Sequence, residues 1–298
     1  MKLQADIQEF DQSRGSLLDF VELTKARIGT FVVISTAVGY VLASPGGLDV
    51  LRLIHTLLAT FLVSSGVCVL NHYLERDYDA RMVRTADRPL PAGRFQPEQA
   101  CVLGVTMLAV GLIYLVGWVN VATALVGVAT AVVYLLAYTP LKRMTVHNTL
   151  VGAVAGALPP VGGWTAAQGE LEFGALVLFL ILFIWQFPHF YSIAWIYRED
   201  YARGGYRMLA VEDPEGNRTA HQMVVYCFLL LPCSLMPALM GLSGTLYFAS
   251  ALFLSGLLVW SSLAFARERS THRARHLLRS TLVYLPVLWL MLIVDRTP

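Results

Sequence analysis

Long apolar stretches, separated by short polar segments, dominate the pattern of this 298-residue chain. A helix needs about 20 mostly apolar residues to cross the hydrocarbon core of a bilayer. Nine windows meet that requirement: residues 28–44, 52–70, 100–118, 121–138, 149–166, 173–197, 222–241, 245–265 and 280–294. The pattern therefore predicts an all-α fold, a polytopic membrane helical bundle with about nine transmembrane helices.

The fifth window contains glycines that favour close helix packing and prolines that disfavour a continuous helix. Gly152 and Gly156 have the spacing that lets neighbouring membrane helices approach closely. Pro159 and Pro160 follow them, and proline removes a backbone donor from a helix. We therefore expect the proline pair to interrupt this helix.

The composition agrees with a membrane protein. Apolar residues make up 56% of the chain and charged residues only 14%, and the mean hydropathy is +0.60. Soluble domains carry roughly 25% charged residues, so a soluble protein with an unusually large core is a poor alternative. The four cysteines have neither metal-ligand spacing nor the density of a disulfide-rich domain. The net charge of +2 gives no reason to expect a nucleic-acid partner.

The distribution of lysine and arginine orients the bundle. With a cytoplasmic N-terminus, the inner segments 1–27, 71–99, 139–148, 198–221 and 266–279 hold 20 of the 22 basic residues, as the positive-inside rule requires. We predict a cytoplasmic N-terminal segment, 1–27, and a nine-helix membrane domain, 28–298, with cytoplasmic loops at 71–99 and 198–221. The N-terminal sequence has the layout of neither a signal peptide nor a transit peptide. We therefore expect a multi-pass protein of a bacterial plasma membrane.

Polar residues continue beyond the second window on one helical face. Because residues advance about 100° each, Asn71, Glu75 and Asp79 fall on that face, with Asp77 nearly opposite. Two carboxylates and an amide form an all-oxygen site, and Mg²⁺ takes one or two carboxylates plus substrate phosphates. Basic residues follow directly: Arg81, Arg84, Arg88 and Arg94. The stretch suits a metal–diphosphate complex; the alternative is a solvated helix end with i,i+4 ion pairs.

The sixth window carries a second polar stripe. Gln186, His189, Tyr197 and Asp200 fall within it, and Glu199 lies off it. At 1.5 Å per residue, His189 lies roughly 13 Å below the charged end. A lone membrane histidine is often only a helix–helix hydrogen bonder, but the acidic rim above it keeps a functional role open.

A basic pair, Lys142 and Arg143, joins the fourth and fifth windows. The pair serves either as positive-inside anchors or as ligands of an anionic substrate. Windows two and six each deliver acids at the cytoplasmic rim, which indicates two pseudo-equivalent halves facing one cavity.

Six motifs occur in a fixed order along the chain. They are Thr24-Lys25-x-Arg27, Asp77-x-Asp79-x-x-Met82-x-Arg84-Thr85-x-x-Arg88-Pro89-Leu90, Leu141-Lys142-Arg143-x-Thr145-x-x-Asn148-Thr149, Gly156-Ala157-x-Pro159-Pro160-x-x-Gly163-Trp164, Trp185-Gln186-x-Pro188-His189-Phe190 and Tyr197-Arg198-x-Asp200-Tyr201 followed by Met208-Leu209. Over roughly residues 20 to 290 they resemble the UbiA superfamily of intramembrane prenyltransferases, and more narrowly its protoheme IX farnesyltransferase (heme O synthase) branch.

The chain departs from the superfamily pattern at two places. The second acid of the first motif is replaced by His72, and the next acid is Glu75. The second acidic motif becomes Tyr197-x-x-x-Tyr201, which leaves only Glu199 and Asp200. The heme branch usually shows this second loss, so it supports the narrower resemblance and puts a second metal in doubt.

The resemblance implies a UbiA-type bundle around a central cavity, with Mg²⁺ as cofactor. It implies transfer of a farnesyl group from farnesyl diphosphate to the 2-vinyl group of heme b, which makes heme O for heme A biosynthesis and terminal oxidases. The implied partners are heme b, farnesyl diphosphate and the lipid bilayer, with heme A synthase or terminal oxidase assembly as recipients.

The resemblance also implies residue roles. The implied metal ligands are Asn71, Glu75 and Asp79, and with Asp200 they form the catalytic set. Arg84, Arg88, Lys142 and Arg143 would bind the diphosphate. The residues expected to meet the heme are His189, His72, Lys25, Arg27, Arg198 and Tyr197.

Two other functions remain alternatives. One is a UbiA-type enzyme that acts on an aromatic quinone precursor. An assay with labelled prenyl diphosphate and each acceptor in turn distinguishes it from a heme farnesyltransferase. A membrane transporter predicts charges near the bilayer midplane, whereas here the charges crowd the cytoplasmic rim.

Overall fold

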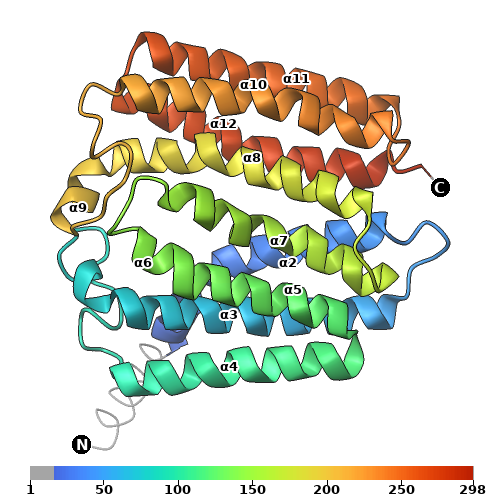
Figure 1. The fold of residues 1–298 in the computed structure, drawn as a ribbon, viewed down its shortest axis with the longest axis horizontal. Coiled ribbons are helices and arrows are strands. Elements are labelled where there is room, and N and C mark those ends of the chain that lie inside the picture. Colours follow the sequence, from blue (N-terminus) through green and yellow to red (C-terminus); the bar gives the residue numbers. More distant parts are fainter. Residues whose placement is uncertain (1–16, 298) are drawn as a thin grey trace, which may run out of the picture.

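The computed structural model describes residues 17–297 and shows a bundle of roughly parallel and antiparallel helices (Figure 1). The long helices are α2 (Ala26–Leu42), α3 (Val50–Asp79), α4 (Pro97–Trp118), α5 (Val121–Val132), α7 (Asn148–Gln168), α8 (Phe173–Ile196), α10 (Asn217–Leu239), α11 (Thr245–Arg267) and α12 (Thr271–Val294). The short ones are η1 (Val133–Tyr138), α6 (Thr139–Leu141) and α9 (Arg198–Arg203). No strand forms among the described residues, so the all-α prediction is confirmed.

Within residues 17–297, eight helices are long and apolar enough to cross a membrane, and the number is nine if a bent pair forms one span. This pair joins Leu17–Leu23 to Ala26–Leu42 at an angle of 51°, and the bend falls at Lys25, whose φ of 47° is left-handed. The prediction of about nine spans is confirmed. Residues 1–16 lie outside the described residues, but 17–27, expected as a cytoplasmic segment, pack on the bundle, because Leu23 is fully buried.

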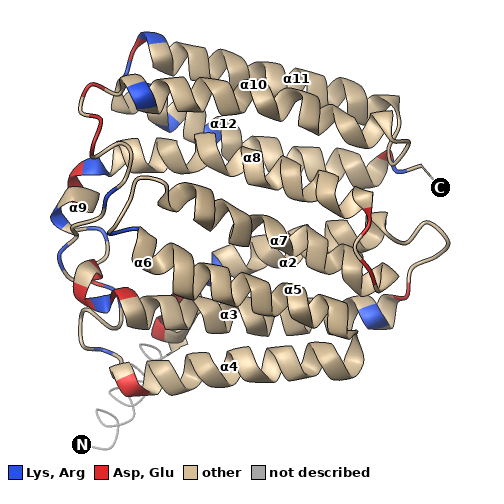
Figure 2. Cartoon of the chain, in the orientation of Figure 1, with Lys and Arg blue, Asp and Glu red and all other residues tan. Residues whose placement is uncertain are grey.

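The helices form two groups around a central helix. α2, α3, α4, α5 and α7 pack on one another, as do α10, α11 and α12, and α8 contacts both groups through α7, α10 and α12. Most charged side chains gather at one end of the bundle, where α9 and the loops after α3 and α6 lie (Figure 2). We call this the charged end; it is the end predicted to face the cytoplasm.

The proline pair does not interrupt the fifth span, contrary to the expectation. Both prolines lie inside α7, which continues to Gln168. Neighbouring helices can hold a proline-containing membrane helix together, and α2 packs closely along α7: a Cβ added to Gly163 would lie 1.9 Å from the Thr36 carbonyl oxygen, and one added to Gly39 would lie 2.0 Å from the Pro160 oxygen.

A turn of π-helix in the fourth span was not foreseen. In η1 the backbone is wound more loosely, and the Thr139 hydroxyl donates to the Tyr134 carbonyl at 2.9 Å. Such turns are frequent at functional sites because they change the direction of the side chains that follow. Here the turn leads directly to Tyr138 and Lys142, which line a cavity.

We predict that Gly163→Ala separates α2 from α7 and lowers the free energy of unfolding by about 1–3 kcal/mol, as overpacking does in cores. Thermal unfolding in detergent measures this. Gly256→Ala in α11 is the matched control, because its Cβ would meet nothing within 4 Å. Equal unfolding temperatures for the two variants would contradict the close packing.

Candidate active site

A cavity of about 600 Å³ opens near the charged end. Its wall combines acids, bases and aromatic rings from five parts of the chain. The charged and imidazole side chains in it are Glu22, Lys25, Arg27, His72, Glu75, Asp79, Arg84, Arg88 and Lys142. The larger apolar and aromatic ones are Leu18, Val21, Ile28, Met82, Tyr138, Phe190, Ile193, Tyr201, Tyr206 and Met208.

The predicted polar row on α3 exists. The helix runs unbroken to Asp79, and Asn71, Glu75 and Asp79 are 1%, 6% and 1% exposed, one helical turn apart. Asp77 points away from them, with a side chain 72% exposed. We call Asn71, Glu75 and Asp79 the acidic row.

Each member of the acidic row meets a cation from another segment. The Lys25 ammonium donates to Asn71 Oδ1 at 2.8 Å, and Lys142 lies 2.7 Å from Glu75 Oε1. Arg88 lies 2.6 Å from Asp79 Oδ2. Buried charges are costly unless they are paired, so these contacts let the acids lie inside the bundle and join the loops after α3 and α6 to the start of α2.

Further contacts fix the direction of the row. The Asn71 amide donates to Thr139 Oγ1 at 3.2 Å, which ties α3 to the end of η1. The Thr85 hydroxyl donates to the Asp79 carbonyl at 2.8 Å and closes the turn that brings Arg88 back. Burial lowers the pKa of Lys142, but the Glu75 carboxylate and the neighbouring tyrosines together outweigh burial and raise this pKa, so the lysine stays protonated.

Arg84, like Arg27, is a cavity cation that no carboxylate pairs with among the described residues, so it is left for a ligand. Its guanidinium lies over the rings of Tyr197 and Tyr201, 5.2 and 5.6 Å from their centroids. Among the described residues it forms no ion pair with a carboxylate. A guanidinium held by aromatic faces keeps its donors free for phosphate oxygens.

Three of the residues predicted to form the catalytic set or to bind the diphosphate do not line the cavity: Asn71, Arg143 and Asp200. Asn71 is buried one turn behind the wall. Arg143 bonds the Tyr78 hydroxyl at 2.5 Å and lies over that ring. Asp200 pairs with Arg203 and accepts from the Val83 amide at 3.1 Å, so it fastens the loop after α3 to α9. The Arg203 guanidinium, helped by that amide, lowers the pKa of Asp200. The structure therefore does not bring Asp200 to the acidic row.

The residues expected to meet heme are spread over several places. Lys25, Arg27 and His72 line the cavity. Tyr197 lies beside the cavity, under Arg84. Arg198 bonds the Trp195 carbonyl and lies over that ring, away from the cavity.

His189 occupies a different position from His72. Its Nδ1 atom lies 2.9 Å from Thr281 Oγ1 on α12, and its ring stacks on Trp185. It is not part of the cavity wall itself, although its neighbour Phe190 is.

Tyr206 is a cavity residue that the sequence did not reveal. Its hydroxyl is buried and has no hydrogen-bond partner among the described residues, and the same is true of both ring nitrogens of His72. Buried polar atoms without partners are rare, so their presence in one cavity wall fits a polar ligand. Tyr206 follows Gly204-Gly205 in a loop, where helical periodicity carries no information.

No group of three or more His, Cys, Asp or Glu side chains in residues 17–297 is arranged to hold a metal ion by itself. The acids of the row are directed at cations instead. A metal held by Glu75, Asp79 and the Asn71 amide would need oxygens from a ligand as well, which is the usual arrangement for Mg²⁺ beside a diphosphate.

These features define a helical membrane bundle with a cavity near one end whose wall combines buried acids, cations and aromatic rings. The chain belongs to the UbiA prenyltransferase family, whose sequence profile matches residues 32–288. It is similar to the protoheme IX farnesyltransferase of Solibacter usitatus, with 46% identity over 287 residues that cover 93% of this chain and 98% of the relative.

Solved structures share the fold. A digeranylgeranylglyceryl phosphate synthase superposes with a TM-score of 0.79 at 17% identity and covers 94% of this chain and 98% of its own. A UbiA homolog from Archaeoglobus fulgidus, bound to GPP and Mg²⁺, superposes with a TM-score of 0.65 at 14% identity and covers 93% of this chain and 99% of its own.

We predict that Asp200→Asn loosens the loop after α3, because the loop loses a partly exposed charged hydrogen bond. Tryptic cleavage in residues 80–96 should then be about two- to tenfold faster. Because the folded-state pKa of Asp200 is lowered, its carboxylate stabilises the folded loop fully above the ordinary pKa of 3.8. This stabilisation is lost as the pH falls through the lower folded-state pKa. Glu199→Gln, which changes an exposed neighbour, is the control. Unchanged cleavage of Asp200→Asn at neutral pH would contradict this role.

Proposed function

We propose that this chain is a protoheme IX farnesyltransferase: it transfers the farnesyl group of farnesyl diphosphate to the 2-vinyl group of heme b and makes heme O. The observation that carries the proposal is a buried acidic row and a set of cations in one cavity, in a chain of the UbiA family that is 46% identical to a protoheme IX farnesyltransferase. The relatives favour heme over a quinone precursor, and charges at the rim rather than the midplane count against a transporter.

Mg²⁺ fits the donor set of the site. Asn71, Glu75 and Asp79 offer only oxygen donors on one helical face, and the unpartnered buried groups of His72 and Tyr206 fit a polar ligand beside them. A structural neighbour of the same fold binds Mg²⁺ with GPP. Bound Mg²⁺ would neutralise part of the diphosphate charge and so make it a better leaving group.

The cations of the cavity would hold the diphosphate. Arg84 is free of carboxylates, while Arg88 and Lys142 neutralise Asp79 and Glu75 in the described structure. With a metal held by the acids, these two cations would be free to turn to the phosphate oxygens, and no charge would be left unpaired. The carbon–oxygen bond then breaks with its electron pair on the diphosphate, in a field of fixed positive charge.

Apolar and aromatic walls would hold the isoprenoid. Ile28, Phe190 and Ile193 line the part of the cavity on the side of α2 and α8. The rings of Tyr138, Tyr201 and Tyr206 line the polar part and can stabilise an allylic cation by about 0.5–2 kcal/mol each.

The acceptor completes the reaction. The vinyl π bond of heme b forms the new carbon–carbon bond with the allylic carbon, and a water oxygen adds to the cation left on the vinyl group and releases a proton. The product would pass to heme A synthase or terminal oxidase assembly. We place the enzyme in a bacterial plasma membrane with the N-terminus and the charged end in the cytoplasm, since 20 of 22 basic residues lie in the segments of that side.

We predict that Glu75→Gln combined with Asp79→Asn lowers heme O formation about 10²- to 10³-fold, because the electrostatic hold on the diphosphate is lost, and abolishes the response of the rate to Mg²⁺. Heme O is measured by chromatography after supplying heme b and farnesyl diphosphate. Asp77→Asn, on the exposed side of the same helix, is the matched control. Unchanged turnover and Mg²⁺ response in the double variant would refute the site.

Arg84→Ala tests the diphosphate contact separately. We expect the KM for farnesyl diphosphate to rise about 10- to 100-fold, the value of a charge-assisted hydrogen bond, while the KM for heme stays within about twofold. A change confined to the heme KM would show that Arg84 binds the acceptor instead.

A further inference from the structure

We propose that Nε2 of His189 binds the iron of the heme acceptor, at a cluster of contacting side chains from α2, α8 and α12 that we call the acceptor cluster (Phe31, Trp185, His189 and Thr281). The inference rests on the proposed function and names the residue that fixes the acceptor. Two histidines, His72 and His189, are candidates by sequence, and their surroundings in the structure differ.

The tautomer of His189 follows from its hydrogen bonds. The Thr281 hydroxyl donates its only hydrogen to the Leu278 carbonyl at 2.6 Å. Its oxygen, 2.9 Å from His189 Nδ1, must therefore accept, so Nδ1 carries the hydrogen. The lone pair then lies on Nε2, and a hydrogen bond on the other ring nitrogen is how proteins orient a metal-binding imidazole.

The Nε2 atom has no hydrogen-bond partner in the described part of the chain, and it is not among the fully buried unpartnered atoms there. Both ring nitrogens of His72 are fully buried. Nε2 of His189 is therefore the more accessible of the candidate iron ligands in the described structure.

Stacked rings hold His189 in place. Trp185 stacks on it with centroids 4.7 Å apart and planes 19° apart, and Phe31 of α2 stacks on Trp185 at 6.0 Å and 16°. The Trp185 indole donates to the Thr281 carbonyl at 3.0 Å. These contacts fix the plane of the imidazole and so the direction in which its Nε2 lone pair points.

The acceptor cluster adjoins the reaction cavity and lies where α2 and α12 meet. His189 lies one turn from Ile193 and next to Phe190, both of which line the cavity. α2 and α12 contact each other far less than either contacts its other neighbours, although Trp289 of α12 bonds Ser35 of α2 at 3.3 Å further from the charged end. A flat acceptor can therefore enter between these helices and present its edge to the acidic row.

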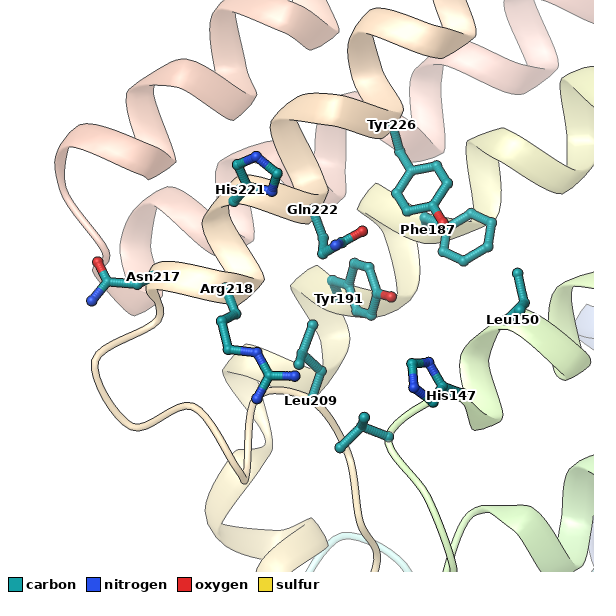
Figure 3. A pocket seen from close by; sticks show the side chains of 11 residues that line it. His147, Leu150, Phe187, Tyr191, Leu209, Asn217, Arg218, His221, Gln222 and Tyr226 are labelled. Atoms are coloured by element: carbon teal, nitrogen blue, oxygen red, sulfur yellow. The ribbon is translucent and has the colours of Figure 1, made fainter.

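A second cavity, of about 470 Å³, is the rival place for a heme (Figure 3). It lies on another side of α8, where Phe187 and Tyr191 line it, and His147 and His221 face it from opposite sides. Both histidines are exposed. A heme there would be separated from the acidic row by α8 and the loop around Leu209, so it could not receive the farnesyl group.

The test is heme binding to the purified chain in lipid nanodiscs, followed by absorption and electron paramagnetic resonance spectra. We expect a histidine-ligated spectrum for the unchanged chain, for His72→Ala and for the double variant His147→Ala, His221→Ala. His189→Ala should lose that spectrum and bind heme at least about tenfold more weakly, and added imidazole should restore it. His189→Met should show a methionine-ligated spectrum, which tests the assignment even if His189→Ala folds poorly.

Thr281→Val is the positioning variant. It keeps His189 but removes the acceptor of its Nδ1 hydrogen, so we expect heme affinity to fall about 10-fold or more and the KM for heme to rise while the KM for farnesyl diphosphate is unchanged.

Two outcomes overturn the inference. One is a histidine-ligated spectrum of unchanged affinity in His189→Ala, and the other is its loss in the His147, His221 double variant. Either result alongside heme O formation by the unchanged chain leaves the proposed function intact. Failure of the unchanged chain to make heme O from heme b would remove the proposed function itself.

Discussion

The pairing of a buried acidic row with cations from distant segments is the constraint on which the structure depends. Glu75 and Asp79 lie almost without exposure inside a membrane protein, where an isolated carboxylate would be prohibitively costly. Lys142 and Arg88 reach them from the ends of two loops. The pairs therefore stabilise the acids and, at the same time, hold the loops over the cavity.

The same pairing explains how one cavity can accept a metal and a diphosphate together. Removing one member of a buried pair leaves an uncompensated charge. On the proposed function, a metal–diphosphate complex would bring both signs at once, so the acids would exchange their cations for the metal while Lys142 and Arg88 would exchange their acids for phosphate oxygens. No buried charge would then be left without a partner, and binding of the metal would depend on the diphosphate.

Much of this could be predicted from the sequence, because membrane spans and helical faces are periodic. The nine windows matched the spans, and the 3.6-residue period placed Asn71, Glu75 and Asp79 on one face and Asp77 on the other. The remainder depends on contacts between distant segments. Nothing local indicates that Lys25 adopts a left-handed conformation at a bend, that Asp200 anchors a loop, or that Tyr206 lines the cavity. α7 is uninterrupted because it packs against α2, and the prolines in the sequence give no information about that packing.

The exchange of partners is tested most directly by metal affinity with and without a diphosphate. Mn²⁺, which reports its own binding by electron paramagnetic resonance, replaces Mg²⁺, and a non-reactive farnesyl diphosphate analogue supplies the phosphates. The account predicts weak Mn²⁺ binding to the chain alone and at least tenfold tighter binding once the analogue is present. Equally tight Mn²⁺ binding without any diphosphate would contradict it, because the acids would then not be held by Lys142 and Arg88.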